Sequence, residues 1–315
     1  MEKTEITKAQ GVVIKSTGSW YTIKTDQGEV LECGIKGKFR QKGIRSTNPV
    51  VVGDRVSFEL HTDQKTGNIT AISERKNYIV RKASKLSKYS QIIAANIDQA
   101  LLITSMVSPE THTEFIDRFL VAAEAYRIPV TIVFNKIDLY SESNMQRMNE
   151  LKSIYLNAGY SSIDVSATEN TNMEVIQESV KDKINLFSGN SGVGKSTLIN
   201  KLDPLLNITT AEISEYHKTG KHTTTFAEMH ELHFGGYIID TPGIKGFGMV
   251  HMEKDEIYHF FPEIFKIAKN CKYYNCKHIN EPDCAVINAV EQGDISISRY
   301  QSYRNLYLDE DSKYR

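Results

Sequence analysis

The sequence predicts a multidomain protein: an all-β barrel, then an α/β domain with a mostly parallel sheet, then a mostly helical segment holding a metal site. Three observations predict this order. Short alternating strands fill residues 1–78, buried apolar strands alternate with helical segments over 92–252, and Cys and His cluster within 253–315. Alternation with period two indicates strands, and a strand–helix alternation indicates a parallel, doubly wound sheet.

The bulk composition is that of a soluble globular protein. The chain has 315 residues, enough for two or three domains, and is 40% hydrophobic and 24% charged. No apolar run is long enough to span a membrane, and the first ten residues lack the apolar core of a secretory signal. We therefore expect a cytoplasmic protein, monomeric and without a membrane partner, whose four cysteines are thiols or metal ligands.

Five short strands separated by turns predict a barrel of the oligonucleotide-binding (OB) type. They are expected at residues 11–16, 20–25, 28–33, 54–60 and 68–73. Residues 1–91 hold 17 Lys and Arg against 9 Asp and Glu, although the whole chain has a net charge of −1. A basic amino-terminal third favours an anionic partner, with nucleic acid as the leading candidate.

The basic charge concentrates in the long loop between the third and fourth strands. A solvated loop would have a similar composition, but five cations without a carboxylate on such a barrel favour contact with RNA. The candidate RNA-binding residues are Lys36, Lys38, Arg40, Lys42 and Arg45. Residues 79–91, IVRKASKLSKYSQ, carry four more cations and are expected to form a basic linker to the next domain.

The α/β domain is expected over residues 92–252, with buried strands separated by segments of helical spacing. The strands are expected at 98–104, 129–134, 161–166, 184–188 and 237–240, with a possible edge strand at 226–234. Helices are expected at 114–126, 145–159 and, beyond this domain, 256–269.

The stretch GNSGVGKST lies between a predicted strand and a predicted helix and fits the phosphate-binding loop pattern. Its glycines allow the backbone N–H groups to approach phosphate oxygens, and the following helix adds its positive amino-terminal end. Lys195 is expected at the β- and γ-phosphates, as a catalytic group, and Ser196 on Mg²⁺. The expected phosphate contacts are Gly189, Asn190, Ser191, Gly192, Val193, Gly194, Lys195, Ser196 and Thr197.

Two further motifs follow the phosphate loop. DTPG comes at the end of a predicted strand, where Asp240 is expected to hold Mg²⁺ and Gly243 to offer an N–H to the γ-phosphate. HTTT, at 222–225, offers a threonine to Mg²⁺, with Thr224 as the expected ligand, although a threonine run before a strand also fits plain β-propensity.

NKID follows the strand at 129–134 and is suited to guanine. Asp138 can accept both donors of the guanine edge, Asn135 can meet the opposite side, and the Lys136 stem can cover the ring. Adenine lacks that donor pair, so such a site discriminates by about 10⁴-fold or more. After the next strand, Ser166 and Ala167 begin SAT, which matches the loop that usually supplies one more backbone N–H to the base, although Ser-Ala is also a common pair with no such role. Together these motifs predict a GTP-binding domain.

The order of the motifs is unusual. Along the chain they run NKID, SAT, GNSGVGKS, HTTT and DTPG, whereas the usual order begins with the phosphate loop and ends with SAT. This order predicts a circularly permuted GTPase domain in which DTPG leads directly into the carboxy-terminal segment.

A cysteine and histidine cluster near the carboxyl end has the spacing C-x₄-C-x-H-x₅-C. Three thiolates and one imidazole suit one closed, tetrahedral, structural zinc site, because four protein ligands leave no open position for catalysis. The expected ligands are Cys271, Cys276, His278 and Cys284.

With these motifs, the chain resembles the ribosome small-subunit-dependent GTPase A family (RsgA/YjeQ) over nearly its full length. The resemblance rests on the barrel, GNSGVGKS, TGKHTTT, DTPGI, the zinc spacing and AANIDQALLI. It implies a late assembly factor that binds GTP, GDP and the rRNA of the small ribosomal subunit, with subunit-stimulated hydrolysis followed by release.

The residue after DTPG is Ile244, which cannot orient water as the Gln of many GTPases does. The resemblance points instead to His222 as the catalytic residue, against a purely structural role. Two alternative functions remain open. One is a GTP-sensing RNA-binding module whose hydrolysis is incidental, and the other is a permuted GTPase acting on the large subunit.

Overall fold

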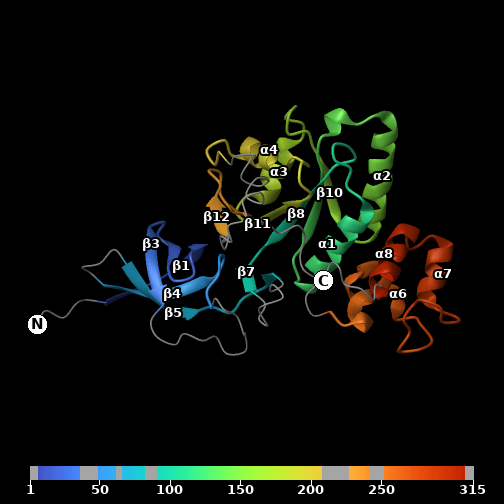
Figure 1. Cartoon of the computed structure of the whole chain (residues 1–315), viewed down its shortest axis with the longest axis horizontal. Coiled ribbons are helices and arrows are strands. Elements are labelled where there is room, and N and C mark those ends of the chain that lie inside the picture. The colour runs from blue at the N-terminus through green and yellow to red at the C-terminus, as the bar shows by residue number, and fades with distance from the viewer. Residues whose placement is uncertain are drawn as a thin grey trace, which may run out of the picture. The chain divides into compact units, whose positions relative to one another are not determined.

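The computed structural model describes residues 6–35, 49–61, 66–81, 91–207, 227–240 and 252–308 (Figure 1). These residues pack as two compact units. The first unit is drawn from residues 1–99, 178–187 and 203–244. The second is drawn from residues 100–177, 188–202 and 245–315.

The amino-terminal part of the first unit is a five-stranded barrel, as predicted. Its strands are β1 (Ile6–Ser16), β2 (Tyr21–Thr25), β3 (Val30–Ile35), β4 (Arg55–His61) and β5 (Thr66–Ile72). They pair in the order β1-β2-β3-β5-β4, and β4 returns to β1 to close the barrel. Buried residues alternate with partly exposed ones along β2, so one face of the strand lines the core. That core contains Val13, Tyr21, Ile23, Cys33, Phe58 and Ile69.

The segment expected as a basic linker begins and ends in paired strands. β6 (Tyr78–Arg81) and β7 (Gln91–Ala95) pair antiparallel, with Tyr78 opposite Ala95 and Arg81 opposite Gln91. This antiparallel pairing satisfies backbone groups of β6 and β7 that an unpaired extended connection would leave to water. The intervening basic residues 82–90 lie outside the described residues.

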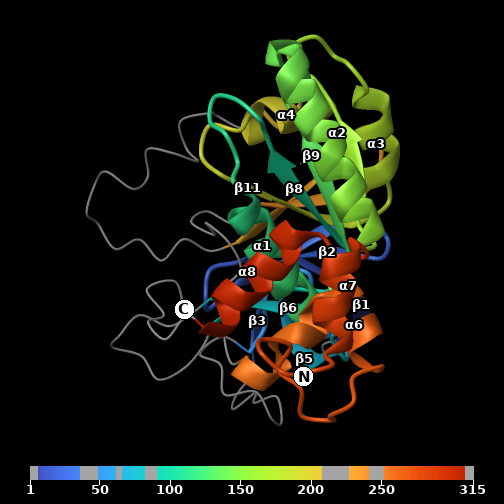
Figure 2. The same ribbon diagram turned by 90° about the vertical axis from the view of Figure 1, so that its right-hand side faces the viewer.

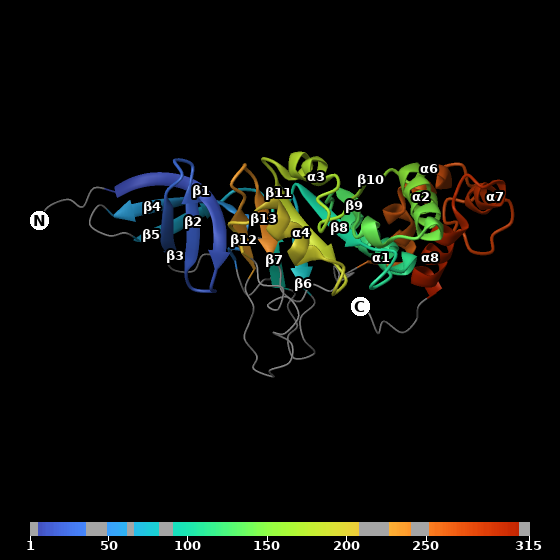
Figure 3. The same cartoon turned by 90° about the horizontal axis from the view of Figure 1, so that it is seen from above.

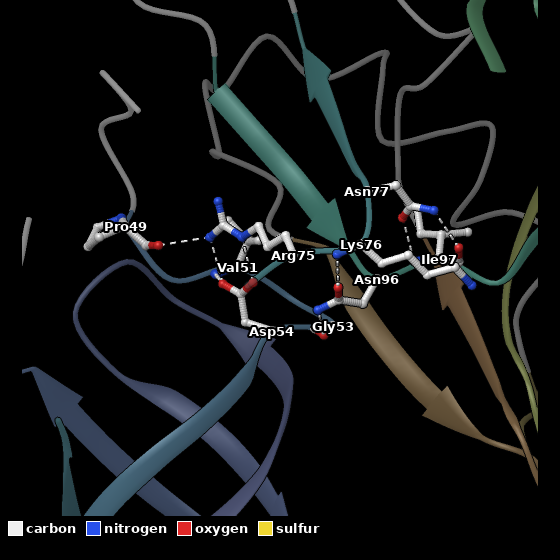
Figure 4. A network of polar contacts seen from close by, with 9 residues as sticks. All are labelled: Pro49, Val51, Gly53, Asp54, Arg75, Lys76, Asn77, Asn96 and Ile97. Atoms are coloured by element: carbon white, nitrogen blue, oxygen red, sulfur yellow. Dashed lines mark hydrogen bonds and ion pairs between the residues drawn. The ribbon is translucent and has the colours of Figure 1, made fainter. Parts of the chain in front are cut away.

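A polar network joins the segments just before β6 and just after β7 to the barrel (Figure 4). The Arg75 guanidinium donates to both carboxylate oxygens of Asp54, at 2.6 and 2.7 Å, and to the carbonyl of Pro49. Asp54 is fully buried, so this bidentate pair provides the compensation that a buried carboxylate requires. The side chain of Asn96 bridges the carbonyl of Gly53 and the N–H of Lys76. The entry to the α/β region is thus fixed to the barrel.

Two strands of the α/β region, β12 (Glu228–Glu231) and β13 (Tyr237–Asp240), and the first four residues of a third, β11 (Ile184–Gly189), belong to the same unit. β11 pairs parallel with β13, and β12 pairs antiparallel with β13. The sequence predicted an edge strand around β12, but its other side pairs with β1 at Lys15 and Glu228. Two ion pairs, Lys15 with Glu228 and Lys24 with Glu231, support this contact. The barrel therefore covers the predicted edge.

The second unit contains a parallel sheet and its helices (Figure 3). β8 (Gln99–Thr104) pairs with β9 (Val130–Phe134), which pairs with β10 (Ser161–Asp164). Every residue of β8 is buried, as expected for a strand covered on both faces. The helices near this sheet are α1 (Thr113–Ala125), α2 (Glu142–Asn157), α3 (Met173–Val180) and α4 (Lys195–Leu202), with a 3₁₀ turn η1 at Ile137–Leu139.

The carboxy-terminal helices belong to the second unit (Figure 2). They are the 3₁₀ segment η2 (Lys254–Phe260), α6 (Pro262–Ala268), α7 (Ala285–Gln292) and α8 (Ile297–Leu308). The single helix predicted over 256–269 is divided at Phe261, because Pro262 lacks an N–H and disfavours a helical residue before it. Among the described residues, no helix is long and apolar enough to cross a membrane.

A buried cation anchors these helices to α1. The Arg299 guanidinium of α8 donates to Asp117 of α1 at 2.8 Å and to Glu263 of α6 at 2.7 Å. Tyr155 of α2 donates its hydroxyl to the same carboxylate of Asp117. Because Arg299 is about 1% exposed, each partner compensates a charge that is removed from water.

Candidate nucleotide site and metal centre

The predicted phosphate loop lies at the end of β11 and continues into α4, as the sequence indicated. Gly189 has a φ of +148°, and a Cβ there would lie 2.2 Å from the carbonyl oxygen of Ile103. Gly194 has a φ of +95°, and a Cβ would lie 2.4 Å from Nδ2 of Asn135. Both positions thus require glycine because of backbone conformation and close neighbours. The loop closes against β8 and NKID.

Lys195 and Ser196 begin α4. The Lys195 ammonium donates to the carbonyls of Gly189 and Asn190, both at 2.6 Å, so the side chain curls over its own loop. Ser196 is buried in the first turn, and Asn190, Ser191, Gly192, Val193 and Thr197 complete the predicted loop. The predicted contact of Lys195 with phosphate stays a prediction.

Asn135 joins three of the predicted motifs. Its amide donates to the carbonyl of Val193 at 2.9 Å, and its oxygen accepts from the N–H of Ala167 at 3.4 Å. Its predicted contact with the base stays a prediction, and its hydrogen bonds link NKID, SAT and the phosphate loop. Asn135 is 1% exposed, so these bonds also satisfy a buried amide.

Lys136 and Asp138, which follow the end of β9, have different surroundings. Lys136 has a left-handed backbone with φ of +66°, and its ammonium donates to the carbonyls of Gly192 and Ser108. Asp138 lies exposed in η1 and is therefore accessible to a ligand. Ser166 is buried and accepts from the N–H of Glu169, which shapes the SAT turn.

Other predicted residues lie partly or wholly outside the described part of the chain. Asp240 ends β13, as predicted, but its side chain lies outside the described part. His222, Thr224, Gly243 and Ile244 lie outside the described residues, as do Lys36, Lys38, Arg40, Lys42 and Arg45. Their expected roles stay predictions.

One loop beside the site was not predicted from the sequence. Residues 105–111 follow β8, and they bring Ser108 to Lys136 and Pro109 to Gly192, where a Cβ would lie 3.3 Å from the proline ring. The available signal was its position, because loops after parallel strands gather at the ligand-binding edge of such sheets.

The predicted metal ligands converge. The ligand atoms of Cys271, Cys276, His278 and Cys284 all lie within 4.8 Å of one another. Sγ of Cys284 lies 3.9 Å from Sγ of Cys271 and 3.6 Å from Sγ of Cys276. Tetrahedral zinc with bonds of about 2.3 Å separates its sulfur ligands by roughly 3.8 Å. The four residues thus fit one tetrahedral metal ion.

Neighbouring groups hold the metal-binding loop in this shape. Tyr300 and Tyr303 of α8 donate their hydroxyls to the carbonyls of His278 and Lys277, and Glu281 accepts from the N–H groups of Lys277 and Ile279. Burial raises the pKa of Cys276 to about 12, so a bound cation is what would convert this thiol to a thiolate at neutral pH.

Comparisons with known proteins agree with this geometry. The family model of the RsgA N-terminal domain matches residues 10–69, and that of the RsgA GTPase matches residues 72–250. A protein of Bacteroides thetaiotaomicron named small ribosomal subunit biogenesis GTPase RsgA 2 is 56% identical over 97% of this chain and 99% of its own length. The small ribosomal subunit biogenesis GTPase RsgA of Flavobacterium psychrophilum is 53% identical over 97% of this chain and 94% of its own length.

Solved structures extend the likeness to the fold. YjeQ from Thermotoga maritima superposes with a TM-score of 0.78 at 33% identity, covering 96% of this chain and 98% of that one. YloQ, described as a circularly permuted GTPase, superposes with a TM-score of 0.74 at 28% identity, covering 96% of this chain and 94% of that one. Because one family model spans more than half of the sequence and both relatives match along almost all of it, the chain belongs to the RsgA GTPase family and has its circularly permuted fold.

Proposed function

We propose that this chain is a GTP hydrolase that acts in late maturation of the small ribosomal subunit. It binds the rRNA of that subunit, hydrolyses GTP faster when bound to it, and leaves after hydrolysis. The proposal includes that it works in the cytoplasm as a monomer and that its partners are the small subunit and guanine nucleotides.

The observation that carries this proposal is the permuted set of GTPase motifs in a chain 56% identical to a protein named as a small-subunit biogenesis GTPase. The described motifs also support it locally. NKID, SAT and the phosphate loop are joined through Asn135, and the strand ends carry them as ligand sites of α/β sheets require.

In the proposed reaction, the chain's own residues position the nucleotide. Asp138 accepts the paired guanine donors, and Lys195 neutralises charge at the β- and γ-phosphates. Ser196, Thr224 and Asp240 would hold Mg²⁺, which would neutralise charge on the phosphate oxygens. His222 orients the attacking water or accepts its proton, because Ile244 cannot do either.

The other parts of the chain supply partner binding. The basic barrel loop contacts rRNA phosphates, and one structural zinc held by the Cys₃His cluster orders the carboxy-terminal loop. The cluster's donor set and spacing support zinc in particular. A structural ion of this kind contributes to folding and takes no part in hydrolysis.

Cosedimentation with separated ribosomal subunits tests the proposal. We expect the chain to pellet with small subunits in a non-hydrolysable GTP analogue and to release in GDP. GTP turnover, measured with and without small subunits, should rise when they are added.

The alternatives predict different outcomes. Binding to small subunits without any rise in turnover would favour a GTP-sensing RNA-binding module with incidental hydrolysis. Pelleting with large subunits alone would favour a GTPase of large-subunit assembly. Either result would overturn the proposed function.

A further inference from the structure

The hydroxyl of Tyr140 connects two loops at the edge of the candidate nucleotide site. It donates to the carbonyl of Asn135 at 2.9 Å and accepts from the backbone N–H of Met106, also at 2.9 Å. Tyr140 follows NKID by two residues, so its ring reaches back over the turn that presents the predicted base-binding groups. Burial raises the pKa of Tyr140, which keeps this hydroxyl protonated and able to donate at neutral pH.

The loop that hydrogen-bonds to Tyr140, residues 105–111, has its two ends hydrogen-bonded to each other. The N–H of Ser105 donates to Oγ1 of Thr111 at 3.1 Å, and the N–H of Thr111 donates to the carbonyl of Ser105 at 2.8 Å. Both residues are at most 1% exposed, so water does not compete for these bonds. Residues 105–111 therefore behave as one small body, and Tyr140 attaches that body to the NKID turn.

The same loop and the same turn are joined again through Lys136. Its ammonium donates to the carbonyl of Ser108 at 2.5 Å and to that of Gly192 at 2.7 Å. Where Lys136 points thus depends on where Ser108 lies, and Ser108 lies in the body that Tyr140 anchors. The left-handed backbone of Lys136 is an uncommon conformation for a residue with a side chain, and the surrounding bonds hold it there.

From this arrangement we infer that Tyr140 is a positioning residue for guanine recognition. Its hydroxyl fixes the Asn135 carbonyl and the 105–111 loop together. Lys136 and Asp138 are thereby presented to the base from a preorganised turn. The inference rests on the proposed binding of guanine nucleotides and adds a residue outside the five motifs to that site.

A preorganised turn should slow the dissociation of the bound nucleotide. Without the hydroxyl, the Asn135 carbonyl and the Met106 N–H lose a partner in a half-buried place, and the turn gains freedom that nucleotide binding must remove. The chemistry at the γ-phosphate involves other residues. The loss should therefore appear in dissociation rate and KM more than in kcat.

The test substitutes Tyr140→Phe in the full-length chain, which removes the hydroxyl and keeps the ring. A matched control is Tyr160→Phe, because the Tyr160 hydroxyl donates to Glu124 at 3.0 Å, away from the predicted motifs. Stopped-flow dissociation of a fluorescent GDP measures retention, and thermal unfolding without nucleotide measures stability. We expect GDP to leave Tyr140→Phe about tenfold faster, with a comparable rise in KM for GTP, whereas the control keeps the wild-type dissociation rate.

Thr111→Val provides a second variant that loosens the same loop from its other end while keeping side-chain shape. It should accelerate GDP release in the same direction. Combined with Tyr140→Phe, it should have less than the summed effect, because both changes act through one loop. This variant keeps the inference testable if Tyr140→Phe folds poorly.

Lys136→Met separates positioning from simple stabilisation. If Tyr140 acts through Lys136, the Tyr140→Phe effect on GDP release should shrink in a Lys136→Met background. An equal effect of Tyr140→Phe on GDP release in both backgrounds would contradict that route.

Two results would overturn the inference and leave the proposed function standing. One is a wild-type rate of GDP dissociation in Tyr140→Phe, and the other is an equal acceleration of GDP dissociation by Tyr160→Phe. Failure of the wild-type chain to bind GDP or GTP would instead overturn the proposed function.

Discussion

The Asn135 side chain donates to Val193 and accepts from Ala167, so this residue, whose predicted place on the base stays a prediction, links three loops. Asp138, three residues further along the same motif, is exposed in η1 and is the residue that we propose binds the guanine edge.

Asp138→Asn is predicted to shift base preference away from guanine. An amide cannot accept both guanine donors, so the discrimination of about 10⁴-fold that such a pair provides should largely disappear. Competition between GTP, xanthosine triphosphate and ATP measures the change, with the exposed Glu150→Gln on α2 as control. Unchanged preference for GTP in the variant would remove Asp138 from the base site.

His222→Ala is predicted to reduce GTP turnover while nucleotide affinity stays near its wild-type value. Loss of a water-positioning or general-base group costs about 10²–10⁴-fold in rate. His217→Ala, in the same segment, is the matched control, and both residues lie outside the described part of the chain. Subunit-stimulated turnover that survives His222→Ala would restrict His222 to a structural role.

At the scale of elements, the carboxy-terminal helices are held to α1 by a buried ion cluster as well as by apolar packing. Val121 of α1 lies in the same core as Phe261, Ile264 and Leu306. DTPG leads toward this segment along the chain, but the segment also has its own anchor on α1 through Arg299.

Arg299→Met should destabilise the chain by about 3–5 kcal/mol, because it leaves the Asp117 and Glu263 carboxylates buried without their cation. Arg304→Met, on the exposed side of the same helix, should change the free energy of unfolding by less than about 0.5 kcal/mol. Urea unfolding compares the two variants. Equal stability of Arg299→Met and wild type would show that apolar packing alone holds α8.

Removal of the metal should unfold the carboxy-terminal loop before the nucleotide site. Metal analysis should find one zinc per chain, and Cys276→Ser should lose it, whereas Cys33→Ala in the barrel core should retain it. Calorimetry with and without a chelator measures the effect on unfolding. A wild-type chain that is purified without metal and melts as a single, unshifted transition would contradict the zinc assignment.

At the scale of the whole molecule, charge is divided between an amino-terminal basic part and an acidic remainder. If the barrel loop binds rRNA, each cation that neutralises a phosphate releases condensed counterions, so affinity for the small subunit falls steeply with salt. Replacing Lys38, Arg40 and Lys42 together with glutamine should weaken binding. The slope of log affinity against log salt should flatten by roughly 0.7–0.9 for each phosphate that is no longer neutralised.

The control for this experiment neutralises Lys181 and Lys201, which are exposed elsewhere. GTP affinity without subunits should stay the same in both variants. Parallel salt slopes and equal affinities for the triple variant and wild type would show that the barrel loop is a solvated surface.

Several features could be predicted because they are local. Alternation located all five barrel strands, buried apolar runs located the strands of the α/β region, and spacing identified Cys271, Cys276, His278 and Cys284. The motif order predicted the circular permutation by which the similar structure of YloQ is described. The prediction of a single helix over 256–269 was wrong, because the segment is divided at Phe261 into η2 and α6. Pro262 in the sequence could have indicated that division.

The sequence by itself thus determined the barrel, the permuted GTPase fold and the Cys₃His cluster, since each depends on periodicity or on residues close together along the chain. Tertiary structure alone decided that β12 pairs with β1, that Arg299 meets Asp117 and that Tyr140 holds the 105–111 loop. These contacts join residues from 34 to 213 positions apart. No local pattern encodes such pairs, because they depend on which surfaces the completed core brings within hydrogen-bonding distance.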